Sequence, residues 1–274
     1  VDVQAHRGGA GLWPENTLTS MTKAVEMGVN TLELDLQISQ DGKVVVSHDA
    51  YFHSRYATRP DGSEVKSEDP KEYLYTMPYS TIAKYDVGKR PSTVWPGKEQ
   101  SPAIKPLATE LIDSVENYVK ANGLDPMRYN IEIKCRKGKD EGKNWPEYHE
   151  FVDKCMELLL SKNLGDRLVV QCIDPRALNY MHEKYPQVKL SYLIRKMDTD
   201  WDTYMGKLNF TPDWLSPEFV IVDQTMVDNC RKAGIRLVPW TVDNEADIRR
   251  ILDLHVEAII TNYPDRVLKI TRGC

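Results

Sequence analysis

Seven side chains that could act together on a phosphate ester occur where strand-like runs of this sequence end. They are His6, Arg7, Glu33, Asp35, His48, Glu132 and Lys134. Imidazoles transfer protons near neutral pH, because their ordinary pKa is about 6.5. Carboxylates are ligands that Mg²⁺ and Ca²⁺ prefer, while guanidinium and ammonium groups bind phosphate oxygens. These residue types indicate acid–base chemistry on an anionic substrate beside a metal ion.

The spacing of the charged residues predicts that they share one face of their strands. Side chains alternate along a strand, so Glu33 and Asp35 point to the same side, and Glu132 and Lys134 do likewise. The intervening positions are apolar, namely Leu32, Leu34, Leu36, Ile131 and Ile133. We expect these leucines and isoleucines to face a layer of helices, which leaves the charged groups pointing into the interior of a barrel.

Three carboxylates at one point repel one another and lose their hydration unless positive charge lies among them. Arg7 and Lys134 supply two positive charges. One divalent cation with oxygen ligands, Mg²⁺ or Ca²⁺, supplies two more. The group then carries a single net positive charge, which suits the single negative charge of a phosphodiester.

Each residue taken singly also has a purely structural interpretation. Glu132 and Lys134 could form an ion pair, and His6 could be a hydrogen-bonded core histidine. Trp240 could pack at the rim, and Asn262 could cap the helix that begins near Pro264. The functional interpretation is favoured because all of them fall at the same end of successive strands, which packing alone does not require.

Runs of strand length alternate with helix-period segments along the chain. The predicted strands are residues 1–5, 31–38, 128–134, 168–173, 189–194, 214–215, 236–241 and 258–261, with 43–48 as a hairpin continuation of the second strand. The predicted helices are residues 16–27, 108–120, 147–161, 175–184, 201–207, 224–232, 245–254 and 264–270, with Thr199 and Asn244 as plausible caps. Eight strand–helix units predict an α/β fold, a TIM (β/α)8 barrel formed by residues 1–274 as one domain.

Residues 51–106 interrupt this alternation. The segment is rich in proline and tyrosine and is long for a plain loop, which predicts an insertion after the second strand. It could be a surface excursion, or a cover over the barrel mouth that presents Tyr51, Phe52, Tyr56 and Trp95.

The bulk properties limit the partners. A net charge of −5 disfavours nucleic acid, whose backbone attracts clustered Lys and Arg. No apolar run approaches the roughly 20 residues of a membrane-spanning helix. The five cysteines, Cys274 included, show no disulfide or zinc spacing. Since the chain begins at Val1, we expect export, for example to a periplasm, with a cytoplasmic location and the oligomeric state left open.

The loop after the first strand combines His6 and Arg7 with Gly8, Gly9 and Gly11. Glycine tolerates unusual dihedral angles and adds no side chain. We expect these glycines to let the loop pass close to a ligand, while Asn16 or Thr17 caps the helix that follows.

The segments AHRGGAGLWPENT, ELDLQ, SHDA, IEIK, PWTVD and TNYPD, in this order, resemble the glycerophosphodiester phosphodiesterases over nearly the entire chain. The resemblance implies a TIM barrel with an insertion after the second strand. It implies metal-dependent hydrolysis of glycerophosphodiesters to sn-glycerol 3-phosphate and an alcohol. One departure is residues 105–110, Lys-Pro-Leu-Ala-Thr-Glu, where the family often has a sequence close to Pro-Thr-Leu-Glu-Glu.

The same resemblance implies a role for each candidate residue. Glu33, Asp35 and Glu132 would hold the divalent metal, and His6 and His48 would be the general acid and base. Arg7 and Lys134 would contact phosphate, while Trp240 would pack against glycerol. The sequence does not assign acid and base between the histidines, nor decide whether water or the neighbouring glycerol hydroxyl attacks phosphorus.

Two other functions stay open at the level of sequence. A barrel of the same type could act on inositol phosphodiesters or lysophospholipids, retaining the metal site and the histidines. A non-catalytic barrel could bind a phosphate or a sugar, although such a protein has no need of two histidines beside an acidic triad.

Overall fold

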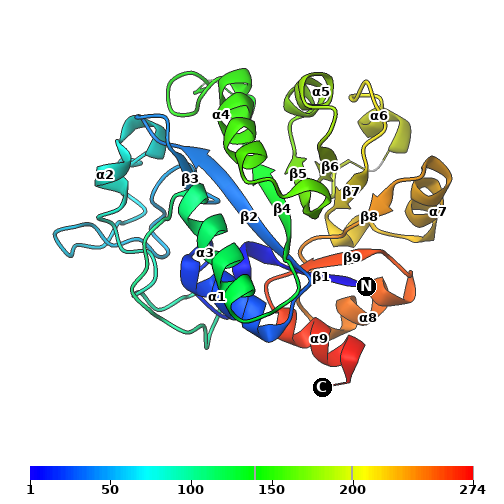
Figure 1. Ribbon diagram of the computed structural model, residues 1–274, viewed down its shortest axis with the longest axis horizontal. Coiled ribbons are helices and arrows are strands. Elements are labelled where there is room, and N and C mark those ends of the chain that lie inside the picture. Colours follow the sequence, from blue (N-terminus) through cyan, green and yellow to red (C-terminus); the bar gives the residue numbers. More distant parts are fainter. Residues whose placement is uncertain (139, 199, 274) are drawn as a thin grey trace.

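The computed structural model describes residues 1–138, 140–198 and 200–273, so the predicted cap Thr199 and Cys274 lie outside the described residues. Eight parallel strands form the central sheet in the order β8-β7-β6-β5-β4-β2-β1-β9 (Figure 1). They are β1 (Asp2–Ala5), β2 (Thr31–Ile38), β4 (Arg128–Ile133), β5 (Leu168–Cys172), β6 (Lys189–Ile194), β7 (Trp214–Pro217), β8 (Arg236–Leu237) and β9 (Ala258–Thr261). The strand β3 (Val44–Val46) pairs antiparallel with β2 and forms the predicted hairpin.

Helices lie around the sheet, as the alternating sequence predicts (Figure 1). They are α1 (Leu18–Met27), α3 (Ala108–Ala121), α4 (Tyr148–Ser161), α5 (Pro175–Lys184), α6 (Trp201–Met205), α7 (Gln224–Ala233), α8 (Glu245–Asp253) and α9 (Pro264–Arg272). The short helices η1 (His6–Gly8), η3 (Gly165–Arg167) and η4 (Phe219–Ile221) lie in the connections. The predicted (β/α)8 barrel is confirmed. No helix within the described part of the chain is both long and apolar enough to cross a membrane.

The barrel is nearly closed by the segment that follows β8. Sequence patterning predicts a strand over 236–241, but β8 spans two residues. Pro239 has no N–H to donate, so the regular ladder stops before it. Its carbonyl still accepts from Ile260 N at 3.0 Å, and Val242 N donates to Ile260 O at 3.0 Å. These bonds join the last two strand regions of the barrel.

Alternation along β2 and β4 sorts the side chains as the sequence predicts. The leucines at 32, 34 and 36 and the isoleucines at 131 and 133 are buried in the main hydrophobic cluster, which they share with residues of α1, α3 and α4. Glu33, Asp35 and Glu132 project to the other face. Burying the apolar face against the helices therefore forces the three carboxylates into the barrel.

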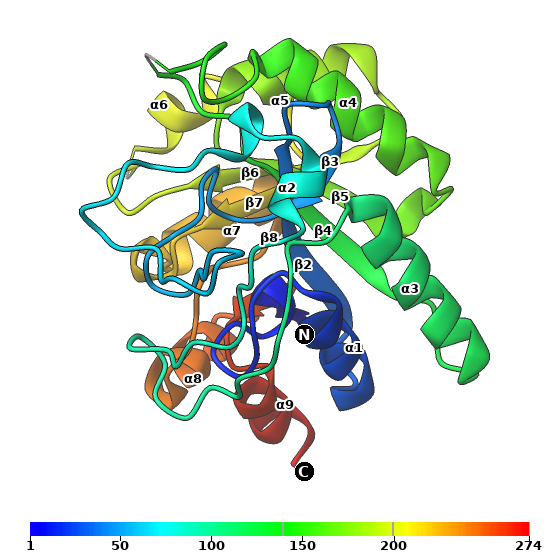
Figure 2. The ribbon, with the colours of Figure 1, turned by 90° about the vertical axis from the view of Figure 1, so that its left-hand side faces the viewer.

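Residues 51–106 lie beyond the C-terminal end of β2 and contain α2 (Tyr79–Ile82) and η2 (Leu74–Thr76) (Figure 1). Figure 2 faces this side and shows the loops of the segment spread around α2. The segment has a small core of its own, in which the rings of Phe52 and Tyr85 stack with centroids 3.8 Å apart. This packing gives the segment a defined structure despite its low helical periodicity.

Candidate active site

A cavity of about 690 Å³ opens at the C-terminal ends of the strands. Its walls include seven of the eight residues to which the sequence assigns a role, namely His6, Arg7, Glu33, His48, Glu132, Lys134 and Trp240. The eighth, Asp35, is fully buried and belongs to the same cluster as Glu33 and Glu132. Within 51–106, Tyr51 lines the cavity, whereas Phe52 is in the core of its own segment and Trp95 borders a separate small pocket.

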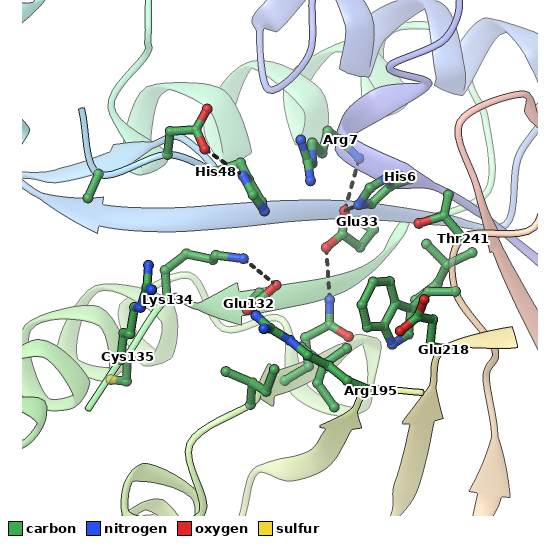
Figure 3. A pocket seen from close by; sticks show the side chains of 18 of the residues that line it. His6, Arg7, Glu33, His48, Glu132, Lys134, Cys135, Arg195, Glu218 and Thr241 are labelled. Atoms are coloured by element: carbon green, nitrogen blue, oxygen red, sulfur yellow. Dashed lines mark hydrogen bonds and ion pairs between the residues drawn. The ribbon is translucent and has the colours of Figure 1, made fainter. Parts of the chain in front are cut away.

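Strand register brings the three carboxylates together. Asp35 on β2 is the direct neighbour of Glu132 on β4, and Glu33 lies two residues earlier on the same face of β2. One oxygen from each residue lies within 4.8 Å of the others. Figure 3 shows Glu33 and Glu132 facing the space between the two histidines and Lys134. The sequence prediction that these acids meet at one point is therefore borne out in the structure.

Basic side chains border the triad, but their positive charge does not neutralise all three carboxylates. Lys134 Nζ lies 2.9 Å from Glu132 Oε2 and 3.4 Å from Asp35 Oδ1, and Arg7 Nε lies 3.4 Å from Asp35 Oδ2. Burial and repulsion from Asp35 raise the pKa of Glu33 well above its ordinary value, and they also raise the pKa of Glu132. Burial opposes ionisation of Asp35 as well, but Lys134, His48 and Arg7 outweigh it and lower the Asp35 pKa.

This charge pattern fits a divalent cation. The three acids cannot all ionise without further positive charge, and their oxygens are the donors that Mg²⁺ and Ca²⁺ prefer. Asp35 Oδ1 is buried and accepts no hydrogen bond from any described residue. A buried carboxylate oxygen without a hydrogen-bond donor is what an oxygen-binding cation would satisfy.

Hydrogen bonds fix the tautomer of His6. The Asp243 carboxylate can only accept, so Asn262 directs its Nδ2 toward Asp243 Oδ2 at 2.7 Å and its Oδ1 toward His6 Nδ1 at 2.6 Å. His6 therefore donates from Nδ1 and leaves Nε2 free, 4.0 Å from Glu33 Oε2. Burial, and then the neighbouring Arg7, lower the pKa of His6 to about 3, which favours the neutral imidazole.

His48 has a different partner. Its Nδ1 donates to Asp49 Oδ1 at 3.0 Å, and Tyr56 OH donates to Asp49 Oδ2 at 3.0 Å. Lys105 Nζ donates to Ser47 Oγ at 2.7 Å and to Tyr56 OH at 3.3 Å, which places a buried ammonium behind this group. His48 is thus oriented by a carboxylate, whereas His6 is oriented by the neutral amide of Asn262. The segment 51–106 thus supports His48 through Tyr56 and Lys105.

The glycine loop does not do what the sequence analysis expects. A Cβ at Gly8 would lie 2.5 Å from Ser20 Oγ, and one at Gly11 would lie 2.5 Å from Tyr263 Cζ. Gly8 and Gly9 also have φ of 79° and 95°, and Gly9 faces Trp13. These glycines are needed for protein packing and left-handed backbone and do not line the cavity, so the expected close approach to a ligand is wrong.

Several supporting residues escape the sequence analysis. Gln171 Nε2 donates to Glu33 Oε1 at 2.8 Å, and Asn16 Nδ2 donates to Asp35 Oδ2 at 2.9 Å. Glu15 accepts from Arg7 Nη1 at 2.9 Å. Thr17, not Asn16, caps α1, and Asn262 orients His6 while Tyr263 is the N-cap of α9. The available signal was their polar type, within the family-like segments for Glu15, Asn16 and Asn262 and within an apolar strand run for Gln171.

An acidic cluster suited to a cation, two imidazoles and two basic side chains at the mouth of a TIM barrel are the groups that hydrolysis of a phosphodiester requires. The comparison with known proteins agrees. The profile of the glycerophosphoryl diester phosphodiesterase family matches residues 6–266, and the chain belongs to this family.

Individual relatives share about a quarter of the residues. A glycerophosphodiester phosphodiesterase from Bacillus subtilis is 26% identical over 277 residues, covering 98% of this chain and 86% of the relative. Human lysophospholipase D GDPD1 is 26% identical over 276 residues, covering 96% of this chain and 83% of the relative. Both relatives therefore align over almost the complete chain.

Solved structures share the fold. A structure from Silicibacter pomeroyi has a TM-score of 0.87 at 23% identity and covers 100% of this chain and 93% of its own. An Oleispira antarctica phosphodiesterase, in complex with the product sn-glycerol-3-phosphate, has a TM-score of 0.74 at 22% identity, with 98% and 96% coverage. At these identities the likeness concerns the barrel.

Proposed function

We propose that the chain hydrolyses glycerophosphodiesters to sn-glycerol 3-phosphate and an alcohol with the help of one divalent cation. The observation that carries the proposal is the buried acidic triad beside two histidines whose ring nitrogens have different partners. Family membership supports it, as do the activity named for the Bacillus subtilis relative and the product in the Oleispira antarctica structure.

The residues that would hold the cation are Glu33, Asp35 and Glu132. When bound, Mg²⁺ or Ca²⁺ supplies positive charge that stabilises the transition state of phosphoryl transfer. Arg7 and Lys134 lie on either side of Asp35 and would bind the remaining phosphate oxygens. Their ion pairs with Asp35 also hold both side chains in place for this contact.

The hydrogen-bond partners support a division of labour between the histidines. His6 is neutral with Nε2 unprotonated, so it takes the proton of the nucleophile. His48 donates from Nδ1 to the Asp49 carboxylate, which orients its ring, and we assign to it the transfer of a proton to the departing alkoxide. This assignment rests on the contrast between the Asn262 amide beside His6 and the Asp49 carboxylate beside His48.

Trp240 would pack against the glycerol moiety. Its Nε1 donates to Ser216 O at 2.8 Å, which fixes the half-buried ring against the cavity. The nucleophile is either water or the glycerol hydroxyl next to the phosphoryl group, which would give a cyclic phosphate first. Turnover of a substrate analogue in which that hydroxyl is methylated would favour water, and loss of turnover would favour the cyclic route.

The testing experiment is a turnover assay with glycerophosphocholine, -ethanolamine, -glycerol and -inositol in Mg²⁺, in Ca²⁺ and in chelator. The proposal expects metal-dependent release of glycerol 3-phosphate. No turnover of any of these substrates would refute it and would favour a barrel that only binds phosphate or sugar.

The human relative named lysophospholipase D supports a second candidate substrate class, the lysophospholipids. Glycerophosphocholine and lysophosphatidylcholine differ by one acyl chain, so their kcat/KM values compare the two directly. The glycerophosphodiester proposal expects glycerophosphocholine to be preferred. Preference for lysophosphatidylcholine would move the assignment to the second class.

A further inference from the structure

Three cations line the cavity away from the two histidines. Arg136 follows β4, and Arg195 and Lys196 follow β6, so they stand on neighbouring sides of the barrel mouth. All three are exposed. In Figure 3 the Arg195 side chain reaches into the cavity toward Glu132. The cavity therefore has basic side chains in addition to Arg7 and Lys134, the pair that would bind the scissile phosphate.

These cations differ from Arg7 and Lys134 in lacking carboxylate partners. Among residues 1–138, 140–198 and 200–273, no ion pair is formed by the side chain of Arg136, Arg195 or Lys196, whereas Arg7 and Lys134 both pair with the acidic triad. Glu218 on the cavity wall contacts this group through the backbone, since its Oε2 accepts from Lys196 N at 2.9 Å.

Three acids of the loops around this side of the cavity, Asp174, Glu141 and Asp198, already have partners. Arg176 Nη2 lies 2.6 Å from Asp174 Oδ2 and 3.2 Å from Glu141 Oε2. Asp198 accepts from Arg195 N at 3.0 Å and pairs with Lys207 at 3.4 Å. Internal contacts thus occupy these three carboxylates and leave the side chains of Arg136, Arg195 and Lys196 available to a ligand.

Aromatic residues give this side of the cavity a wall. The Arg136 guanidinium lies 5.9 Å from the centre of the Trp145 ring, and Trp145 packs edge-on against Tyr73 with centroids 5.3 Å apart. Tyr73 in turn contacts Tyr51, which joins the segment 51–106 to the loop after β4. Tyr51 and Trp145 line the cavity and are half-buried. A substrate bound against these two rings would contact Arg136, which lies beside Trp145.

We propose that Arg136, Arg195 and Lys196 form a second anion-binding subsite in the same cavity, which selects glycerophosphodiesters whose alcohol carries a further phosphate. The inference rests on the proposed function and deepens it to a substrate class. The scissile phosphate is met by Arg7, Lys134 and the cation-binding triad. Arg136, Arg195 and Lys196 form no ion pair with the triad among the described residues, and their exposed side chains would meet the head group at the cavity mouth. Arginine binds a phosphate monoester through paired N–H donors, which suits Arg136 and Arg195 to this task.

The test compares two substrates that differ by one phosphate, glycerophosphoinositol and glycerophosphoinositol 4-phosphate. In wild-type enzyme with Mg²⁺ at low salt, we expect kcat/KM for the phosphorylated substrate to be about 5- to 20-fold higher, as two exposed charge pairs would give. The ratio should fall toward 1 in 0.5 M NaCl, because salt screens exposed charges.

The variant is R136Q/R195Q, in which both side chains are exposed and removable without loss of a core contact. We expect its ratio between the two substrates to fall to about 1–2. The control is Lys232→Gln, an exposed cation on α7 outside the cavity, which should retain the wild-type ratio.

The outcomes separate the two proposals. Turnover of both substrates at equal kcat/KM in wild type, or an unchanged ratio in R136Q/R195Q, overturns the subsite and leaves the phosphodiesterase assignment intact. No turnover of either substrate with Mg²⁺ or Ca²⁺ overturns the subsite, and the proposed function falls with it only if glycerophosphocholine, -ethanolamine and -glycerol are not turned over either.

Discussion

Neutral isosteres of Glu33 and Asp35 should change the stability of the metal-free protein in opposite directions. Burial and Asp35 raise the pKa of Glu33, so its ionised form costs stability above pH 4.5. Asp35 is held ionised by Lys134, His48 and Arg7, so its charge stabilises the fold. In chelator at pH 7 we expect Glu33→Gln to raise the free energy of unfolding by about 1–3 kcal/mol and Asp35→Asn to lower it.

The pH dependence follows from the same signs. A carboxyl group with a raised folded-state pKa contributes stability at low pH that is lost as the pH rises above its unfolded value. The metal-free wild type should therefore lose stability relative to Glu33→Gln as the pH increases above 4.5. A glutamine at position 33 can still accept the Arg7 N–H bond, which is 2.9 Å long in the wild type. Its amide nitrogen replaces the oxygen that accepts from Gln171 Nε2, so the change of the stability difference with pH, and not its size at one pH, reports the charge.

Divalent cation should shift the stability difference between the two proteins toward the wild type by about 2.3 kcal/mol, which reverses their order where the metal-free difference is smaller than this. At a metal concentration of about 100 times Kd, the wild type gains about 2.7 kcal/mol. For a chain of this size that is a rise in Tm of about 5–10 °C. A variant with about 100-fold weaker binding gains about 0.4 kcal/mol, or about 1–2 °C, at the same concentration.

The assay is differential scanning calorimetry in chelator, Mg²⁺ and Ca²⁺, with the exposed Glu183→Gln as the control that should behave as wild type. The reasoning fails if Glu33→Gln destabilises the metal-free protein and still gains the full wild-type increment from metal. Such a result would mean that ionised Glu33 neither destabilises the metal-free protein nor binds the ion.

Three further predictions concern the proton-transfer groups. His6→Ala and His48→Ala should each lower kcat by about 10²- to 10⁴-fold with the fold retained, and near-normal turnover in either would remove that residue from the mechanism. Asp49→Asn should lower kcat by about 10- to 100-fold with little change in KM, because the ring loses its orienting carboxylate; an unchanged kcat would show that Asp49 does not act through His48. Burial lowers the pKa of Lys105 to about 8 from 10.5, so the unfolded chain holds the extra proton between these values. The wild type should therefore gain stability relative to Lys105→Met as the pH rises from about 8 to 10.5, and denaturant titrations giving a constant difference would contradict the burial of a charged Lys105.

The barrel and the acidic triad could be predicted because both follow from local periodicity. Alternation along 31–38 and 128–134 separates the apolar face from Glu33, Asp35 and Glu132, and parallel register then sets Asp35 beside Glu132. The end of β8 at Leu237 was not predicted, although Pro239 gives the physical reason.

The supporting contacts could not be predicted, because they join distant parts of the chain. Asn262 lies 256 residues from His6, and Gln171 lies 138 residues from Glu33. Which partner a single amide meets depends on loop paths that no local pattern specifies. The role of Gly11 was misjudged for the same reason, since its Cβ direction leads to Tyr263.

The most direct test of the metal site is anomalous diffraction from crystals soaked in Mn²⁺. The account predicts one strong peak with oxygens of Glu33, Asp35 and Glu132 at about 2.0–2.6 Å. A peak elsewhere, or no peak at the triad in an enzyme whose turnover needs the metal, would contradict it.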